Sequence, residues 1–303
     1  MDEVTAFSPG HITGFFQICD QTTELLLQGS RGAGISISNG VTTKIRVRSS
    51  SQSSFEIRIN GTPTKSATVS EYVINSFLAR GGKDYEIFVD HAVTVPIGSG
   101  LGSSGAGALS LALALNEALN LGLSRMEAAQ IAHIAEVKCK TGLGTVIAET
   151  FGGAEIRVAP GAPGIGKITP IPLNDDYAVV CLNLGNLSTK KILSDTKFRH
   201  RINKSGEKLV DKLIAHPTPA NFMTFSRNFA EELGLISPRV RKIFTETDRT
   251  SITCSMVMFG ETIFSLIKRN ETKEIFEVFG RHARSNYSPF ITEIDFKGAR
   301  LVE

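Results

Sequence analysis

The spacing of apolar residues along the chain follows two periods, one typical of strands and the other typical of helices. Apolar residues alternate with polar or β-branched ones in short segments, which is the period of a strand. Expected strands lie at 44–47, 55–59, 85–95, 177–184, 251–260, 261–267 and 291–296. Longer segments have the period of a helix. Expected helices cover 69–78, the apolar run from 105, 125–140, three stretches that end near 244, and 271–284. The first two strands predict a hairpin-like meander.

A glycine- and serine-rich loop, PIGSGLGSSGAGA at 96–108, joins one of these strands to an Ala/Leu helix that is apolar nearly all round. Glycine permits positive φ and a close approach of the main chain to a ligand. The first turn of a helix presents N–H groups without helical partners and the positive end of the helix dipole. A loop of this kind binds phosphate. Ser124 and Glu127 then form a capping box for the following helix.

Other phosphate loops and catalytic turns do not fit these flanks. Residues 100–105 match GxGxxG, but a dinucleotide-binding unit needs a second parallel strand after its first helix, and here a helix follows a helix. No Gly-Lys-Ser/Thr tripeptide stands at the helix entry, and the protein-kinase motifs HRD and DFG do not occur. The GxSxG pattern fails at each serine of the loop.

Composition favours an intracellular enzyme of one large or two moderate domains. A net charge of +3 over 303 residues predicts no nucleic-acid partner. Four scattered cysteines without a CxxC pair predict free thiols in a reducing compartment. No apolar stretch is long enough to span a bilayer, and no signal-like segment opens the chain. We therefore expect a cytoplasmic protein with no membrane partner.

The proline- and glycine-rich segment APGAPGIG at 159–166 predicts a linker. We place the domain boundary there, with one α/β domain at 1–165 and a second at 166–303. Mixed strands and helices in the second half suit a ferredoxin-like α+β layer.

The loop at 96–108 resembles the second motif of the GHMP kinases, which has the form P-x-x-x-G-L-G-S-S-A-A. Gly105 and Gly107 stand where that motif has alanines. AFSPGHITGFF at 6–16, QGSRGAGISISNGV at 28–41 and TGLGTVIAETFGGAEIRVAPGAPGIGK at 141–167 resemble the archaeal pantoate kinase branch. The resemblance covers essentially the whole chain. It implies a two-domain fold with an N-terminal S5-domain-2-like domain that binds ATP and a C-terminal ferredoxin-like domain.

The resemblance also implies which residues bind Mg²⁺-ATP. Ser104, the second serine of the motif, would ligate Mg²⁺ through its hydroxyl, and Glu136, just ahead of the TGLG turn, would supply a carboxylate. A hydroxyl, one carboxylate and phosphate oxygens suit this cation. The residues expected to cradle the triphosphate are Pro96, Gly98, Ser99, Gly100, Leu101, Gly102, Ser103 and Ser104.

Thr145 occupies a position where the mevalonate kinase branch leads us to expect a catalytic aspartate. A threonine cannot accept a proton as a carboxylate does. Three explanations remain open. Phosphoryl transfer through a loose transition state needs little deprotonation, so the enzyme needs no base; or Glu149, one helical turn away, substitutes; or the protein is impaired. Thr145 stays in the predicted catalytic set with Ser104 and Glu136.

Pantoate carries a carboxylate, so its site requires a cation or a group of N–H donors. Arg31, between two glycines, is the leading candidate, and Arg157 on a strand-like segment is the second. His11 lies in the first motif and is expected to hydrogen-bond the substrate or the loop backbone. The full predicted substrate set is His11, Thr13, Ser30, Arg31, Gly32 and Arg157.

The predicted reaction is transfer of the ATP γ-phosphoryl group to pantoate, giving 4-phosphopantoate for coenzyme A biosynthesis. Homoserine and mevalonate-like hydroxy acids remain alternative substrates, since they also present a hydroxyl and a carboxylate. A non-catalytic ligand-binding protein of the same fold remains a rival, because of Thr145 and because the third family motif is reduced to CSMVMFGET with a single glycine. We assign no site residue to that third segment. The family makes a homodimer possible, although no segment demonstrates one.

Overall fold

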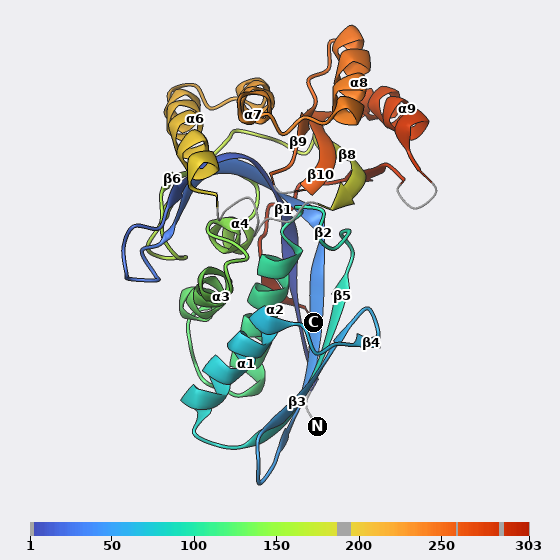
Figure 1. Cartoon of the computed structure of the whole chain (residues 1–303). Coiled ribbons are helices and arrows are strands. Elements are labelled where there is room, and N and C mark those ends of the chain that lie inside the picture. Colours follow the sequence, from blue (N-terminus) through green and yellow to red (C-terminus); the bar gives the residue numbers. More distant parts are fainter. Residues whose placement is uncertain (1–2, 187–194, 259, 285–287, 303) are drawn as a thin grey trace.

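Two sheets organise the computed structural model, which describes residues 3–186, 195–258, 260–284 and 288–302 (Figure 1). The larger sheet contains β1 (Glu3–Cys19), β2 (Gly29–Ser49), β3 (Ser54–Ile59), β4 (Thr62–Pro63), β5 (Tyr85–Val93), β6 (Ala154–Ala159), β7 (Lys167–Pro170) and β12 (Arg300–Val302). The smaller sheet contains β8 (Tyr177–Asn186), β9 (Ser255–Met256), β10 (Gly260–Lys268) and β11 (Phe290–Thr292).

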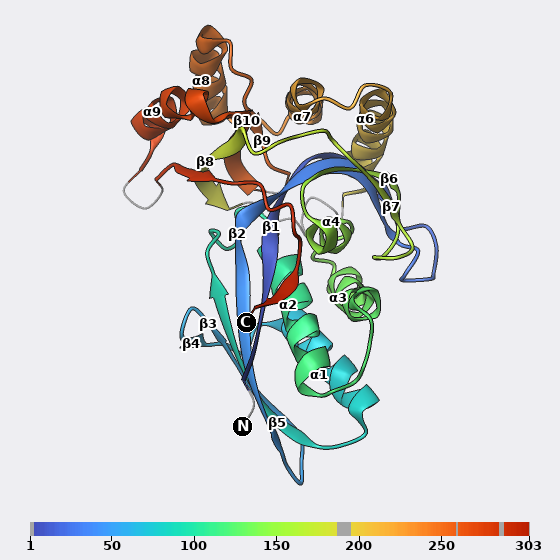
Figure 2. The same cartoon turned by 180° about the vertical axis from the view of Figure 1, so that it is seen from behind.

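Helices flank both sheets. α1 (Thr68–Gly81), α2 (Ser103–Ala118), α3 (Arg125–Cys139) and α4 (Thr145–Phe151) belong to the first half of the chain. α6 (Thr196–Ala215), α7 (Pro219–Leu233), α8 (Pro238–Thr247) and α9 (Thr272–His282) belong to the second. Figures 1 and 2 show α1, α2 and α3 on one side of β1 and β2, α6 over the bent end of these strands beside β6, and α7 to α9 near the smaller sheet. The chain therefore forms a mixed α/β fold, as expected.

The long antiparallel pair β1–β2 connects the two halves (Figure 2). Its register shifts between Pro9 and Gly10 and again between Thr13 and Phe15. Such bulges bend a strand and redirect its side chains. The two irregularities bracket His11 and Thr13, so the sequence SPGHITG bends beside the phosphate loop.

The expected meander between 44–47 and 55–59 is wrong. Both segments are strands, but β5 lies between them, antiparallel to β2 and parallel to β3. α1 provides the crossover that a parallel β3–β5 pair needs. The strand order of the larger sheet is β12-β1-β2-β5-β3-β4. In addition, β6 pairs with β2, and β7 pairs with β6.

The helices that follow the phosphate loop agree with the pattern of the sequence. α2 is buried from Gly105 to Leu115 on all faces, because it is covered by the sheet, α1 and α3. α3 begins with the expected capping box: Ser124 accepts from the Glu127 N–H, and the Glu127 carboxylate accepts from the Ser124 N–H. The expected strands at 85–95 and 177–184 and the helix at 271–284 are also confirmed within a few residues.

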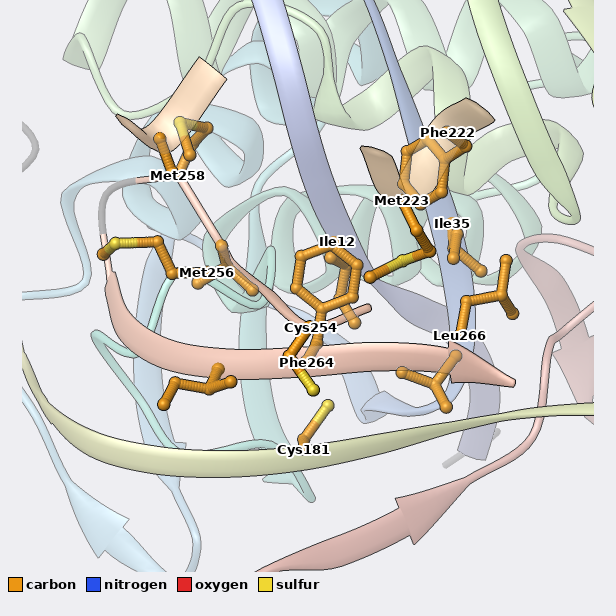
Figure 3. Close-up of a cluster of buried hydrophobic side chains, with 14 of the residues drawn as sticks. Ile12, Ile35, Cys181, Phe222, Met223, Cys254, Met256, Met258, Phe264 and Leu266 are labelled. Carbon is orange, nitrogen blue, oxygen red and sulfur yellow. The ribbon is translucent and has the colours of Figure 1, made fainter. Parts of the chain in front are cut away.

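The apolar core of the second half continues into β1 and β2. Figure 3 shows Ile12 and Ile35 of these strands beside Phe222 of α7, Phe264 of β10 and Cys181 of β8, all of them buried. The smaller sheet is therefore packed on the bent part of the larger one. All four cysteines are free thiols, as expected.

The proposed division at 165/166 remains a prediction, but strand pairing crosses it. β7 pairs with β6 in the larger sheet, and β12 returns from the end of the chain to pair with β1. The segment at 159–166 is an ordered turn in which the Gly166 N–H donates to the Ala162 carbonyl. Within the described residues, no helix has the length and apolarity to cross a bilayer.

Candidate active site

The phosphate loop reaches α2 through three glycines in the left-handed region. Gly98, Gly100 and Gly102 have φ of 78°, 83° and 74°, which residues with a side chain rarely adopt. Gly102 is the N-cap of α2, and no side chain caps the helix there. The first N–H groups of α2 therefore point at the loop without a protein acceptor, which is the arrangement that binds an anion.

A cavity of about 430 Å³ opens at this helix end. The phosphate loop forms one wall, β1 and β2 form another, and the turn between α3 and α4 forms a third. The lining residues are His11, Thr13, Phe16, Ser30, Ile97, Gly98, Gly100–Gly105, Glu136, Cys139–Thr145, Arg157 and Met258. Most of the predicted nucleotide and substrate residues therefore lie around one space.

Glu136 and Ser104 meet at the wall of the cavity. The Ser104 hydroxyl donates to Glu136 Oε1 over 2.6 Å, and the Thr141 hydroxyl donates to the same oxygen over 2.6 Å. Burial raises the pKa of the Glu136 carboxyl, and these two hydrogen bonds lower it in part. The expected pairing of the second motif serine with a helix-end glutamate is thus present in the geometry.

Arg157 and Glu155 form a buried ion pair on β6. The two residues are two positions apart on a strand, so their side chains share a face. Arg157 contributes to the cavity wall, and its Nε has no hydrogen-bond partner among the described residues. Burial lowers the pKa of the Arg157 guanidinium, and Glu155 opposes that shift. Ser30 lies next to Arg157, since both surround Gly144.

Arg31, the leading candidate for the substrate carboxylate, does not line the cavity. Its guanidinium donates to the Val158 carbonyl, to Gln17 Oε1 and, over 2.6 Å, to Asp211 Oδ1 on α6. Alternation along β2 explains the error, because Ser30 faces the cavity and the next residue must face the opposite side. Arg31 is therefore withdrawn. Of the two lining cations among the described residues, Lys140 is exposed and Arg157 is buried, so Arg157 is the candidate that the geometry favours.

The other predicted residues either line the cavity or pack behind the residues that line it. Pro96 and Ser99 lie behind the phosphate loop, where the Ser99 hydroxyl donates to the Pro96 carbonyl over 2.5 Å. Gly32 also supports the site, since a Cβ on it would lie 2.6 Å from Arg157 Nη2. Thr145 lines the cavity as the first residue of α4. His11 and Thr13 line it from β1.

Glu149 is fully buried behind the phosphate loop and does not line the cavity. A Cβ on Gly105 would lie 2.8 Å from its Oε2, so the glycine that replaces a motif alanine leaves room for this carboxyl. Both carboxyl oxygens lack a hydrogen-bond partner in the described part of the chain. Burial, with smaller effects of Glu136 and Glu155, raises the pKa of Glu149 well above its ordinary value. Its position excludes direct contact with a substrate in the cavity.

Several contributors were not predicted from the sequence, among them Thr141, which donates to Glu136, and the three residues described next. Met258 lines the cavity, and Gly260 lies so close to the loop that a Cβ on it would overlap the Ser99 carbonyl oxygen. The reduced third motif therefore does reach the phosphate loop, by packing. Glu155 was also missed, although its spacing of two from Arg157 in AEIRVA was a visible signal that both face one side.

Comparison with known proteins agrees with this geometry. The family described as GHMP kinases N terminal domain matches residues 68–153. The chain is 37% identical to the pantoate kinase of Thermococcus kodakarensis, covering 89% of this chain and 90% of the relative. It is also 37% identical to that of Methanocaldococcus jannaschii, covering 90% and 96%.

A solved structure described as a phosphotransferase related to the CoA biosynthesis pathway has a TM-score of 0.90 and 33% identity, and it covers 99% of both chains. The likeness in sequence and structure extends over almost the full length of the relatives, and the family match contains the phosphate loop. This chain belongs to the pantoate kinase family of the GHMP kinases.

Proposed function

We propose that this chain transfers the γ-phosphoryl group of ATP to a hydroxyl of pantoate, giving 4-phosphopantoate, in the cavity at the N-terminus of α2. The observation that carries the proposal is that one cavity joins an uncapped helix end, a hydroxyl–carboxylate pair and a buried guanidinium. Phosphoryl transfer depends mainly on positioning and on neutralising charge, which these groups supply. The names of the relatives support pantoate as the acceptor and coenzyme A biosynthesis as the pathway.

The site has the chemistry of a Mg²⁺ site beside the triphosphate. A serine hydroxyl and a carboxylate oxygen lie 2.6 Å apart at the cavity wall, and Mg²⁺ is usually held by one or two carboxylates together with substrate phosphates and water. Among the described residues, no group of three acidic, histidine or cysteine side chains surrounds one point. Ser104 and Glu136 would hold Mg²⁺, which would neutralise phosphate charge.

The phosphate loop and the residues that bind the acceptor have different roles. The N–H groups at the start of α2, with Gly98, Gly100 and Gly102, bind the phosphates. Arg157 binds the pantoate carboxylate, and Ser30 beside it donates a hydrogen bond. Because the acceptor is held at its carboxylate, its hydroxyl is oriented toward the γ-phosphate, which is the positioning that this reaction requires.

The test is a panel of acceptors with Mg²⁺-ATP: pantoate, homoserine and mevalonate, with ADP release and the phosphorylated product both measured. We expect turnover with pantoate. Glu136→Gln should lower kcat by about 100-fold or more, as expected for loss of a charge-stabilising group. Glu127→Gln, at the exposed start of the same helix, is the matched control and should retain activity. Nucleotide binding without turnover on any acceptor would instead support the non-catalytic alternative.

A second prediction concerns the role of Arg157 in pantoate binding. Arg157→Lys keeps the charge but loses the planar fork, so the KM for pantoate should rise about 10- to 100-fold, the range of one charged hydrogen bond, while the KM for ATP stays unchanged. Arg31→Lys, on the opposite face of β2, is the control and should leave both constants unchanged. Thermal melting of both variants checks folding. An unchanged KM for pantoate in Arg157→Lys would contradict the assignment.

A further inference from the structure

A chain of three side chains runs from the cavity into the protein. Thr13 Oγ1 lies 3.2 Å from His11 Nδ1, and His11 Nε2 lies 3.0 Å from Glu155 Oε1. Thr13 is half-buried and lines the cavity, whereas the His11 and Glu155 side chains are inaccessible to solvent. A hydroxyl, an imidazole and a carboxylate in this order form the arrangement in which a histidine activates a hydroxyl.

The ion pair with Arg157 sets the direction of these hydrogen bonds. Glu155 forms an ion pair with Arg157 as a carboxylate, and a carboxylate only accepts hydrogen bonds. His11 Nε2 therefore carries the proton and donates to Glu155, which leaves the Nδ1 lone pair to accept from the Thr13 hydroxyl. The carboxylate fixes both the tautomer and the orientation of the imidazole ring.

The backbone holds this chain of groups against the phosphate loop. The His11 N–H donates to the Leu101 carbonyl over 3.1 Å, and the Met258 N–H donates to the Thr13 carbonyl over 3.2 Å. Gly34 on β2 leaves room for the imidazole ring, since a Cβ there would overlap its Cε1 and Nε2. Thr13 thus stands between the loop and the wall that contains Arg157.

The cavity contains few other proton acceptors. Glu136 is the one carboxylate among the described lining residues, and it is hydrogen-bonded to Ser104 and Thr141. Thr145 stands where a carboxylate was expected, and Glu149 lies behind the loop. Besides Glu155 and Arg157 on β6, the Glu149 carboxyl of α4 also lies close to this part of β1, since it adjoins Gly102 together with the His11 N–H.

We propose that Thr13 is a catalytic residue that removes the proton of the acceptor hydroxyl, with His11 and Glu155 as positioning residues. This inference rests on the proposed function. As the acceptor oxygen forms its bond to the γ-phosphorus and the bond from phosphorus to ADP breaks, the hydroxyl proton passes to Thr13 Oγ1. The proton of Thr13 passes in turn to His11 Nδ1. The resulting imidazolium is stabilised by Glu155. After product leaves, its Nδ1 proton returns to Thr13 Oγ1 as Thr13 releases a proton to water in the cavity.

The test compares Thr13→Val, which removes the hydroxyl at constant shape, with Thr13→Ser, which restores it. We expect Thr13→Val to lower kcat by about 100-fold or more, the usual contribution of a positioned acid or base, with the KM for pantoate unchanged. Thr13→Ser should recover most of the rate. The matched control is Thr43→Val, because the hydroxyl of the fully buried Thr43 contacts His91 Nδ1 over 2.8 Å and neither residue lines the cavity.

The split between kcat and KM separates proton transfer from a structural role. His11→Gln should lower kcat as Thr13→Val does, with the KM for pantoate unchanged and with the nucleotide still bound. A Thr13→Val variant with wild-type kcat, or a Thr13→Ser variant that recovers none of the rate, would overturn the relay.

These assays distinguish a failure of the proposed acceptor, pantoate, from a failure of the proposed proton relay through Thr13. Turnover by the wild type with homoserine or mevalonate but not with pantoate would overturn the proposed acceptor, and the ratio of Thr13→Val to wild type on the acceptor used would still decide the relay. If His11→Gln does not fold, the comparison of Thr13→Val with Thr13→Ser still tests the relay. A wild type without turnover on any acceptor would overturn both proposals.

Discussion

At the residue scale, Glu149 is the most unusual group in the chain. Its carboxyl is fully buried, its oxygens have no hydrogen-bond partner in the described structure, and its pKa is raised well above 4.5, chiefly by burial. A buried carboxyl without a partner is retained in its neutral form. Folding therefore keeps a proton on Glu149 at a pH where the unfolded chain has released it.

This linkage predicts that the protein loses stability as pH rises. Below about pH 4.5 the Glu149 carboxyl is protonated in both the folded and the unfolded state, so it has no effect on the pH dependence of stability. Above this pH, the free energy of unfolding falls by about 1.4 kcal/mol per pH unit until the Glu149 carboxyl of the folded state ionises. Glu149→Gln removes this dependence, so the variant should be more stable than wild type at pH 7 and equal to it near pH 4.5. Urea unfolding at several pH values measures the difference.

Glu127→Gln is the control of opposite sign. Hydrogen bonds from Ser124 lower the pKa of Glu127, so its contribution is present at neutral pH and disappears as pH falls. Loss of this carboxylate should therefore lower stability at pH 7. A Glu149→Gln variant that is less stable than wild type at pH 7, as in this control, would show that the Glu149 carboxylate is ionised and paired.

At the element scale, local patterns predicted the helices and the phosphate loop well. The capping box at Ser124, the apolar surface of α2 and the glycine-rich entry at 96–104 are properties of neighbouring residues, and the structure contains each of them. The positions of Ser104 and Glu136 followed from the family motif. Local signals sufficed here because each element is determined within one or two turns of chain.

Pairing between strands that are distant along the chain could not be predicted from local patterns. The strand β5 enters between two segments that are neighbours in sequence, and β12 pairs with β1 from the far end of the chain. The error at Arg31 has the same origin: a shift of one residue on a strand moves a side chain to the other face, and only the paired sheet fixes which face is inside. Which face of β6 Arg157 and Glu155 occupy likewise depends on how β6 pairs with β2.

At the scale of the whole molecule, the smaller sheet supports the phosphate loop of the larger one. Thr262 on β10 donates to the Ser99 carbonyl over 2.9 Å, and it also contacts Asn183 of β8. Gly260, at the start of β10, lies directly against Ser99 and Gly100. The loop is thus held between α2 and β10, so its anion-binding conformation depends on residues about 160 positions away in the chain.

Gly260→Ala tests this dependence. Its Cβ would overlap the Ser99 carbonyl oxygen, and because main chain cannot move aside as a flexible side chain does, loop and strand must separate. We expect a loss of about 1–3 kcal/mol in the free energy of unfolding, as for other overpacked positions, together with a raised KM for ATP. Gly280→Ala, in α9 with no atom near the new Cβ, is the control and should be neutral or stabilising. Equal nucleotide affinity in the two variants would show that the loop keeps its shape without the smaller sheet.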